Sequence, residues 1–323
     1  MLRYAVGLPN VREYADPRLL VELAEEAQAG GWDGVFVWDH IAREEDPSIP
    51  ATDPWIALAG MAVATQRVRL GIMVTPLARR RPWKVAREVV ALDALSGGRF
   101  TLGVGLGGGA QAEFAAFGEP TDARVRAELL DEGLAILDGL RSGVPFSFDG
   151  THYHVTGAHF TPRPVQQPRV PVWVAGRWPN RRPFRRAARW DGVFPVFEGV
   201  GAGEMPTPDQ LAEAVTYTRA HRTGEGASLG VAVGTTMTAL GPAALRSTHG
   251  DDTTPRRPQP QGGPCRTRSR QASSGPRNHP SASTHHVSPA RAYVSASAPS
   301  FAPVLTHSSA TSKAPSSVRC ARV

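Results

Sequence analysis

The sequence predicts an α/β protein in which parallel strands alternate with helices. Two observations carry this prediction. Short apolar runs recur through the first 240 residues, and most are followed by a segment whose apolar residues have helical spacing. Glycine or proline separates most of these segments, as is typical where strands and helices end. Repeated units of this length form either an open doubly wound sheet or an eight-stranded barrel.

Seven strands are expected, each of them a short run rich in Val, Leu, Ile or Phe. They cover residues 4–8, 33–38, 68–75, 99–105, 170–175, 191–196 and 228–236. Helices are expected between them, several opened by a proline in the first turn. They cover residues 17–29, 54–65, 83–95, 121–140, 183–189 and 208–221. A hairpin with its turn at Asp149-Gly150 interrupts the alternation between residues 143 and 169.

Composition divides the chain into two parts. Residues 1–252 hold 26 basic and 29 acidic side chains, whereas residues 253–323 hold ten basic and no acidic ones. We expect one domain over residues 1–240, with the hairpin insertion at 143–169, and a disordered, low-complexity basic tail over residues 241–323. The abrupt change of composition suggests a shifted reading frame in a GC-rich gene, a hypothesis that resequencing its 3′ end tests.

Composition also restricts the classes of function. Both cysteines, Cys265 and Cys320, lie in the tail, so the domain needs no disulfide or thiolate metal site. His152, His154 and His159 have no carboxylate or cysteine at a useful spacing, so we expect no metal. The basic tail contains no recognisable nucleic-acid module. Without a signal peptide or a long apolar run, we expect a cytoplasmic protein that binds neither nucleic acid nor membrane.

Residues 99–118 join a buried strand to a glycine-rich loop. The glycines at 103, 105, 107, 108 and 109 remove side chains at the carboxyl end of this strand, where the ring or phosphate of a ligand can approach the backbone. A plain turn is the other interpretation. The loop also fits G-x-G-x-x-G, but it follows the fourth strand and no acid ends a fifth strand about 20 residues later, which disfavours a dinucleotide fold.

Several segments resemble the bacterial luciferase-like monooxygenases, over roughly residues 2–238. They are VWDH at 37–40, RLGIMVTPLARRRPWKVAREVVALDALSGGRFTLGVGLG at 69–107, EFAAFGEPTDARVRAELLDEGLAIL at 113–137, FDGTHYHV at 148–155, PRPVQQPRVPVWVAG at 162–176 and ARWDGVFPV at 188–196. The resemblance implies a TIM (β/α)8 barrel, here without a recognisable eighth βα unit. It also implies an oxidoreductase or monooxygenase that uses FMN or the deazaflavin coenzyme F420 on a small organic substrate, by hydride transfer or O2 incorporation.

The resemblance further implies where the site lies and which residues form it. His40 would transfer a proton, and Glu113 would hydrogen-bond the substrate, so both are expected to be catalytic. A non-proline cis peptide near residues 73–75 would back the cofactor ring. The residues expected to bind the cofactor are Asp39, Val74, Thr75, Gly105, Gly107, Gly176, Arg177 and Trp178. A homodimer, if the barrel is complete, and a separate flavin or F420 reductase are the expected partners.

Simpler interpretations of these residues stay open. His40 can be an exposed loop histidine, and Glu113 can cap the segment that follows it. Backbone amides at Gly176–Trp178, with the arginines beside them at a helix start, suit a phosphate but can also be a solvated surface. Arg79–Arg81 can meet an anionic cofactor tail or lie in solvent.

Two other functions stay open as well. A barrel without its eighth strand exposes two sheet edges, so an inert or cofactor-free truncated barrel is one alternative. An NAD(P)-dependent dehydrogenase is the other. It needs an acid after the second strand to hold ribose, a role that Asp39 could fill, and it would bind NAD(P) without a flavin.

Overall fold

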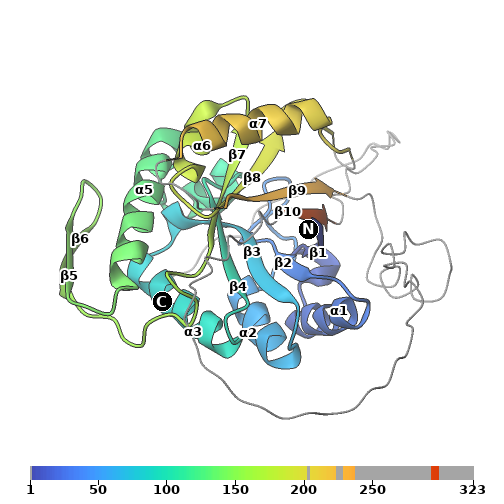
Figure 1. Cartoon of the computed structure of the whole chain (residues 1–323), viewed down its shortest axis with the longest axis horizontal. Coiled ribbons are helices and arrows are strands. Elements are labelled where there is room, and N and C mark those ends of the chain that lie inside the picture. The colour runs from blue at the N-terminus through green and yellow to red at the C-terminus, as the bar shows by residue number, and fades with distance from the viewer. Residues whose placement is uncertain (1, 202–203, 223–227, 237–291, 298–323) are drawn as a thin grey trace, which may run out of the picture.

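Eight parallel strands close into a barrel in the computed structural model (Figure 1). The structure describes residues 2–201, 204–222, 228–236 and 292–297. Around the barrel the strand order is β1-β10-β9-β8-β7-β4-β3-β2. The strands are β1 Leu2–Leu8, β2 Gly34–Val37, β3 Arg69–Pro76, β4 Phe100–Gly105, β7 Val172–Trp178, β8 Gly192–Phe197, β9 Gly230–Thr236 and β10 Ala292–Ser297. The expected TIM barrel is therefore confirmed.

Helices cover the outside of the barrel, and three of the seven described helices begin with an acidic or hydroxyl cap followed by a proline. They are α1 Pro17–Ala29, α2 Pro54–Ala64, α3 Pro82–Leu95, α4 Ala110–Glu113, α5 Ala123–Leu140, α6 Arg181–Ala187 and α7 Pro208–Ala220. Single 3-10 turns occur at η1 Arg12–Tyr14, η2 Leu77–Arg79 and η3 Ala115–Phe117. A separate antiparallel hairpin, β5 Phe146–Asp149 and β6 His154–Ala158, lies beside α5 (Figure 1). No helix among the described residues has the length and apolar character that a membrane span requires.

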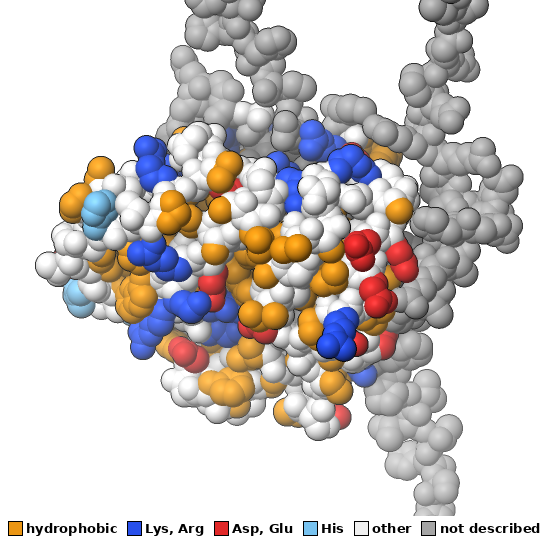
Figure 2. All heavy atoms as spheres, turned by 90° about the horizontal axis from the view of Figure 1, so that it is seen from below, with side chains coloured by type: hydrophobic (Ala, Val, Ile, Leu, Met, Phe, Trp, Pro, Cys, Tyr) orange, Lys and Arg blue, Asp and Glu red, His pale blue; other side chains and the backbone are white. Residues whose placement is uncertain are grey.

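The outer side of α2 is apolar and uncovered. Ile56 and Val63 are 68% and 64% exposed, and Leu95 at the end of the neighbouring α3 is 48% exposed. Figure 2 shows apolar side chains gathered across the middle of the face on which these helices lie. Exposed apolar groups that gather in this way are typical of an interaction surface.

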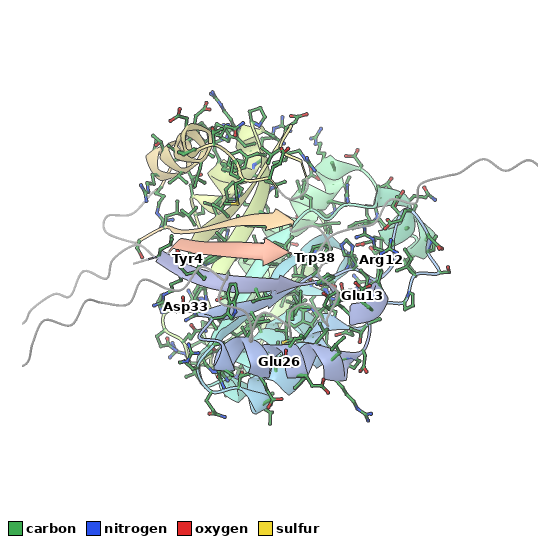
Figure 3. All side chains as sticks on the ribbon, turned by 90° about the vertical axis from the view of Figure 1, so that its right-hand side faces the viewer. Tyr4, Arg12, Glu13, Glu26, Asp33 and Trp38 are labelled. Atoms are coloured by element: carbon green, nitrogen blue, oxygen red, sulfur yellow. The ribbon has the colours of Figure 1, made fainter. Side chains whose placement is uncertain are left out.

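The strand β10 differs from the sequence-based expectation. The sequence predicts a disordered tail over residues 241–323, but β10 lies within that range and pairs in parallel with β1 on one side and β9 on the other (Figure 3). Its sequence, AYVSAS, mixes serine and alanine with only two larger apolar residues and so does not stand out as an apolar run, and the ladders on both sides stabilise it instead. The remainder of the predicted tail, residues 241–291 and 298–323, lies outside the described residues.

Large side chains fill the lower part of the barrel interior. Phe36, Met73 and Trp173 pack there, with small residues around them. A Cβ atom on Gly192 or Gly230 would lie 2.7 or 2.8 Å from the indole of Trp173, so glycine at these positions leaves room for the ring. This packing closes the barrel below its carboxyl-end rim, where the strands leave a cavity.

Candidate active site

The carboxyl ends of the strands surround a cavity of about 610 Å³. Small-molecule sites typically measure about 300–1,000 Å³. Among the described residues, the apolar lining comes from two sides of the barrel, with Phe36, Trp38, Met73 and Val74 at the ends of β2 and β3 and Phe194, Pro195, Val196 and Phe197 on β8 opposite them. The polar lining consists of Asp39, His40, Arg43, Glu113, Arg177 and Glu204. In TIM barrels this rim is the usual place of the active site.

His40 follows β2, and Asn10 fixes its backbone. The buried amide of Asn10 accepts from the His40 N–H at 3.1 Å and donates to the His40 carbonyl at 2.7 Å. Nδ1 of the imidazole is hydrogen-bonded to Oε1 of Glu113, which α4 places on the other side of the rim. Nη1 of Arg43 lies 3.1 Å from Nε2. Because a guanidinium only donates, Nε2 accepts and the proton sits on Nδ1 in this arrangement.

Arg79 joins the two carboxylates of the site. Its Nη1 donates to Oε2 of Glu113 at 2.5 Å, and its Nη2 donates to the carbonyl and to Oδ1 of Asp39 at 2.6 and 3.0 Å. The side chain is almost fully buried. Arg79 therefore neither lies in solvent nor has a free guanidinium for a cofactor tail. It fixes the loops after β2 and β4 relative to each other.

The carboxylate of Asp39 accepts hydrogen bonds from four side chains of the protein. It accepts from Arg80 at 2.8 Å, from Arg79, from the Thr75 hydroxyl, and from the indole N–H of Trp55 at 3.4 Å. Burial favours the neutral acid, but the charges of Arg80 and Arg79, with hydrogen bonds from Arg80 and Thr75, outweigh it and hold the pKa of Asp39 below its ordinary value. No oxygen is left to hold a ribose, so the NAD(P) alternative loses its main support.

The end of β3 forms the apolar side of the cavity. The Met73-Val74 peptide is cis, where the resemblance to the luciferase-like proteins implies such a bond. The pairing of β3 with β4 shifts register between Ile72 and Thr75, and Val74 lines the cavity while Thr75 is buried behind it. Gly105 does not line the cavity. A Cβ there would lie 2.9 Å from Val74, so this glycine leaves room for the Val74 side chain.

Of the three residues expected at the end of β7, only Arg177 reaches the cavity. Its side chain is exposed and makes no ion pair with any residue that the structure describes. Trp178 instead packs edge-on against Phe184 at 4.9 Å, and a Cβ on Gly176 would meet Pro183 at 2.4 Å. The amides at the start of α6 offer little, because this helix has seven residues and Asn180 already accepts from its first turn.

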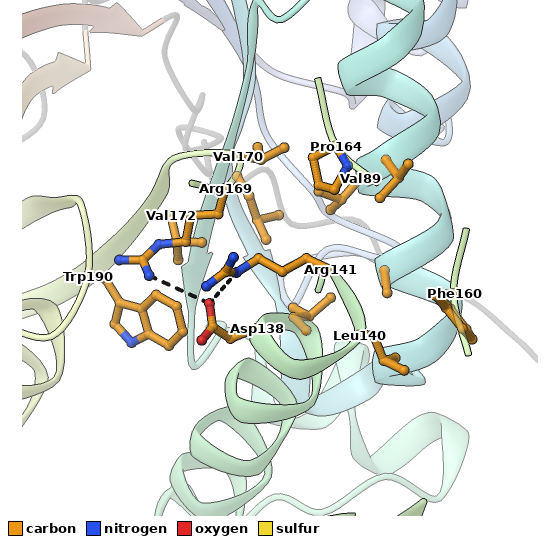
Figure 4. A pocket seen from close by; sticks show the side chains of 14 residues that line it. Val89, Asp138, Leu140, Arg141, Phe160, Pro164, Arg169, Val170, Val172 and Trp190 are labelled. Atoms are coloured by element: carbon orange, nitrogen blue, oxygen red, sulfur yellow. Dashed lines mark hydrogen bonds and ion pairs between the residues drawn. The ribbon is translucent and has the colours of Figure 1, made fainter. Parts of the chain in front are cut away.

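A second, smaller hollow lies outside the barrel between α3 and α5 (Figure 4). It measures about 40 Å³ and is lined mainly by apolar groups such as Val89, Leu140 and Phe160. Its charged groups are paired with each other, since Asp138 accepts from Arg141 at 2.6 Å. We therefore regard this hollow as a packing feature.

Comparison with known proteins identifies the family. The family model described as luciferase-like monooxygenase matches residues 3–279. The chain belongs to the luciferase-like monooxygenase family, so the resemblance noted in its sequence is confirmed.

Two of the chain's relatives are F420-dependent glucose-6-phosphate dehydrogenases. That of Gordonia bronchialis is 35% identical over 61% of this chain and 58% of the relative. That of Beutenbergia cavernae is 34% identical over 71% of this chain and 63% of the relative. The chain thus spans about three fifths of the length of these curated relatives.

Solved structures share the fold at lower identity. An F420-dependent secondary alcohol dehydrogenase in complex with an F420-acetone adduct has a TM-score of 0.58 at 20% identity, covering 72% of this chain and 68% of that chain. The monooxygenase RslO1 from Streptomyces bottropensis has a TM-score of 0.59 at 24% identity, covering 73% and 72%. These likenesses show the fold alone.

The sequence-based expectations miss Asn10, Arg43, Glu204 and the structural role of Arg79. Asn10 and Arg43 are polar residues that follow β1 and β2, so their position after a strand could have indicated them. Arg79 was considered only as part of a basic run. Leu77 and Ala78 in the same turn are apolar and buried, and they could have indicated that Arg79 is buried as well.

We expect Asp39→Asn to destabilise the protein, because it leaves the guanidinium of Arg80 without a negative partner and the buried guanidinium of Arg79 with Glu113 alone. The free energy of unfolding at pH 7 should fall by about 3 kcal/mol. Below about pH 4 the unfolded chain protonates Asp39 before the folded protein does, so the wild type loses this stabilisation as the pH falls. The difference in the free energy of unfolding between variant and wild type should therefore become smaller below about pH 4.

Urea unfolding at a series of pH values measures this gap. Asp149→Asn is the matched control, because Asp149 is almost fully exposed and pairs only with the exposed His154. It should leave stability unchanged. A constant gap between Asp39→Asn and wild type from pH 7 to pH 3 would contradict the assignment.

Proposed function

We propose that this chain is an oxidoreductase that binds coenzyme F420 or FMN in the 610 Å³ cavity and acts on a small organic substrate. The observation that carries the proposal is the linked set His40, Glu113 and Arg79 at the rim. It places a neutral imidazole, oriented by an anchored carboxylate, beside an apolar wall. This combination suits proton transfer next to a redox ring.

The residues of the cavity fit such a cofactor. Val74, Met73 and Phe36 offer an apolar surface for a flat ring, and Gly107 offers backbone without a side chain. The guanidinium of Arg177, which makes no ion pair within the described part of the chain, suits a phosphate. When bound, the cofactor supplies the hydride transfer or the activation of O2. The F420-dependent relatives favour the deazaflavin over FMN.

Each polar residue then has a defined role. His40 accepts or donates a proton at Nε2, and Glu113 accepts the hydrogen bond from Nδ1–H and so holds the imidazole in a fixed orientation. Arg79 keeps Glu113 in place. Arg43 now donates to Nε2, so a substrate hydroxyl or carbonyl must displace its guanidinium in order to reach His40.

The proposal predicts that the purified full chain binds F420 or FMN but not NAD(P). Quenching of cofactor fluorescence measures the dissociation constants. Arg177→Ala should weaken FMN binding about tenfold and leave riboflavin, which has no phosphate, unchanged. Arg181→Ala, which removes a nearby exposed arginine from above Tyr217, is the control. A folded protein that binds neither cofactor would support an inert barrel, and tight NAD(P) binding would support a dehydrogenase of another class.

His40→Gln should separate chemistry from binding. With a substrate found by screening small alcohols, carbonyl compounds and sugar phosphates, kcat should fall by about 100-fold or more. The Kd of the cofactor should change by less than threefold from the wild-type value. The His40 side chain contacts Glu113 and Arg43 and forms only a small part of the cavity lining. Unchanged kcat in stopped-flow and steady-state assays would exclude His40 as the proton-transfer group.

We also propose that the chain forms a homodimer through the apolar face of α2, defined by Ile56 and Val63. The packing of α2 between α1 and α3 places opposite charges on its two sides, since α1 exposes Glu25 while α3 exposes Lys84 and Arg87. A two-fold axis that runs along α2 in the interface brings α1 of one copy opposite α3 of the other. The face is thus complementary to itself, as a two-fold interface must be.

Ile56→Glu should convert this dimer to a monomer, because it places a charge at the centre of the apolar face. Sedimentation velocity measures the change. Phe117→Glu alters an equally exposed apolar residue away from α2 and should leave the dimer intact. A monomeric wild type, or a variant that stays dimeric, would rule out this interface.

A further inference from the structure

Arg43 places a positive charge directly beside the imidazole of His40. It follows β2, lines the cavity, and exposes only 17% of its side chain. Nε of its guanidinium donates to Oε1 of Glu45 at 3.0 Å, and Nη1 donates to Nε2 of His40 at 3.1 Å. Nη2 has no hydrogen-bond partner among the residues that the structure describes. One end of the guanidinium is therefore anchored, while the other end can turn toward a ligand.

The carboxylates around the cavity compensate this positive charge only in part. Glu45 is 39% exposed and also accepts from Arg12 at 3.3 Å, so two guanidinium groups share one carboxylate that water screens. Asp39 and Glu113 are already paired with other arginines. Glu204 follows β8, on the opposite side of the barrel from β2. The side of the cavity next to the imidazole can therefore accept an anion.

A carboxylate is a better partner for Arg43 than the imidazole is. Nε2 of His40 is a single neutral acceptor, whereas a carboxylate offers two charged oxygens that match the planar fork of Nη1 and Nη2. A substrate carboxylate therefore draws the guanidinium away from Nε2, and an uncharged alcohol does not. Once the guanidinium has turned, Nε2 is open to the group that lies next to the carboxylate.

We propose that Arg43 is a specificity-determining residue that binds a substrate carboxylate, and that the substrate is a 2-hydroxy acid whose hydroxyl donates to Nε2 of His40. Because Nη1 and Nε2 lie only 3.1 Å apart, the two groups that they bind have to be neighbours in the substrate. When this hydroxyl is oxidised, its proton passes to Nε2, the hydride of the same carbon passes to oxidised F420 or FMN, and a 2-oxo acid forms. The inference rests on the proposed function, which it narrows to one class of substrate.

Lactate and 2-propanol are the matched probes, since 2-propanol has a methyl group in the place of the carboxylate. The full chain, labelled with ¹⁵N-histidine, is titrated with each probe without oxygen, in the presence of reduced F420 or FMN, which cannot oxidise the probes. The ring signals of His40, identified by their loss in His40→Gln, should shift on binding and give the Kd. Wild type should bind lactate at least about 30-fold more tightly than 2-propanol.

Arg43→Met removes the guanidinium and keeps most of the length of the side chain. It should weaken lactate binding about 30-fold, while 2-propanol binds at least as well as before, because no guanidinium then competes for Nε2. Arg43→Lys keeps the charge without the planar fork and should lie between Met and wild type. Arg12→Met is the matched control, because Arg12 binds the same Glu45 but is not among the described residues that line the cavity. It should change the Kd of lactate by less than about threefold.

The outcomes distinguish this inference from the function on which it rests. A wild type that binds neither F420 nor FMN overturns the proposed function and the reaction of the 2-hydroxy acid with it. A wild type that binds a cofactor but does not prefer lactate to 2-propanol overturns the role of Arg43 alone, as does an Arg43→Met variant that weakens both probes equally. 3-Hydroxybutyrate, whose hydroxyl is one carbon farther from the carboxylate, should bind about tenfold more weakly than lactate. Equal binding of these two acids would overturn the 2-hydroxy acid as the substrate class.

Discussion

The buried pairing of Arg79 with Asp39 and Glu113 is the interaction on which the site depends. Two carboxylates removed from water repel each other and lose hydration, and one guanidinium between them compensates for both effects. The three residues come from the segments after β3, β2 and β4. They meet only because these three strands are adjacent and parallel, with their carboxyl ends at one rim. The geometry of the barrel therefore determines the geometry of the site.

Much of this arrangement could be predicted from local patterns. Apolar runs and proline or aspartate caps located seven strands and the helices between them, because burial and end-capping act over a few residues. The family resemblance, together with the position of His40 directly after a strand, indicated His40, Glu113 and Arg177, and all three line one cavity. The position of Val74 beside a cis peptide came from the family resemblance, since no local rule predicts such a bond.

The expectations that differ from the structure depend on side-chain direction or on long-range pairing. Successive residues of a strand point to opposite faces. Arg177 and Trp178 therefore could not both reach the cavity, and alternation places Gly176 and Trp178 together on the other face. Arg79 and Arg80 pair with Asp39 because the 3-10 turn η2 directs both side chains toward the end of β2. The spacing of residues in the sequence does not reveal this direction. The strand β10 owes its existence to partners far away in the chain.

The strand β10 comes more than 50 residues after β9 in the sequence, and this distance affects how the barrel folds. On a ribosome, the first seven barrel strands emerge well before residue 292, and until then β1 and β9 each present an unpaired backbone edge. The final ladder joins the two ends of the sequence, so it contributes a high contact order and carries a large loop-closure cost. Until β10 is added, the sheet is therefore open between β1 and β9, and two exposed strand edges are available for pairing with other chains.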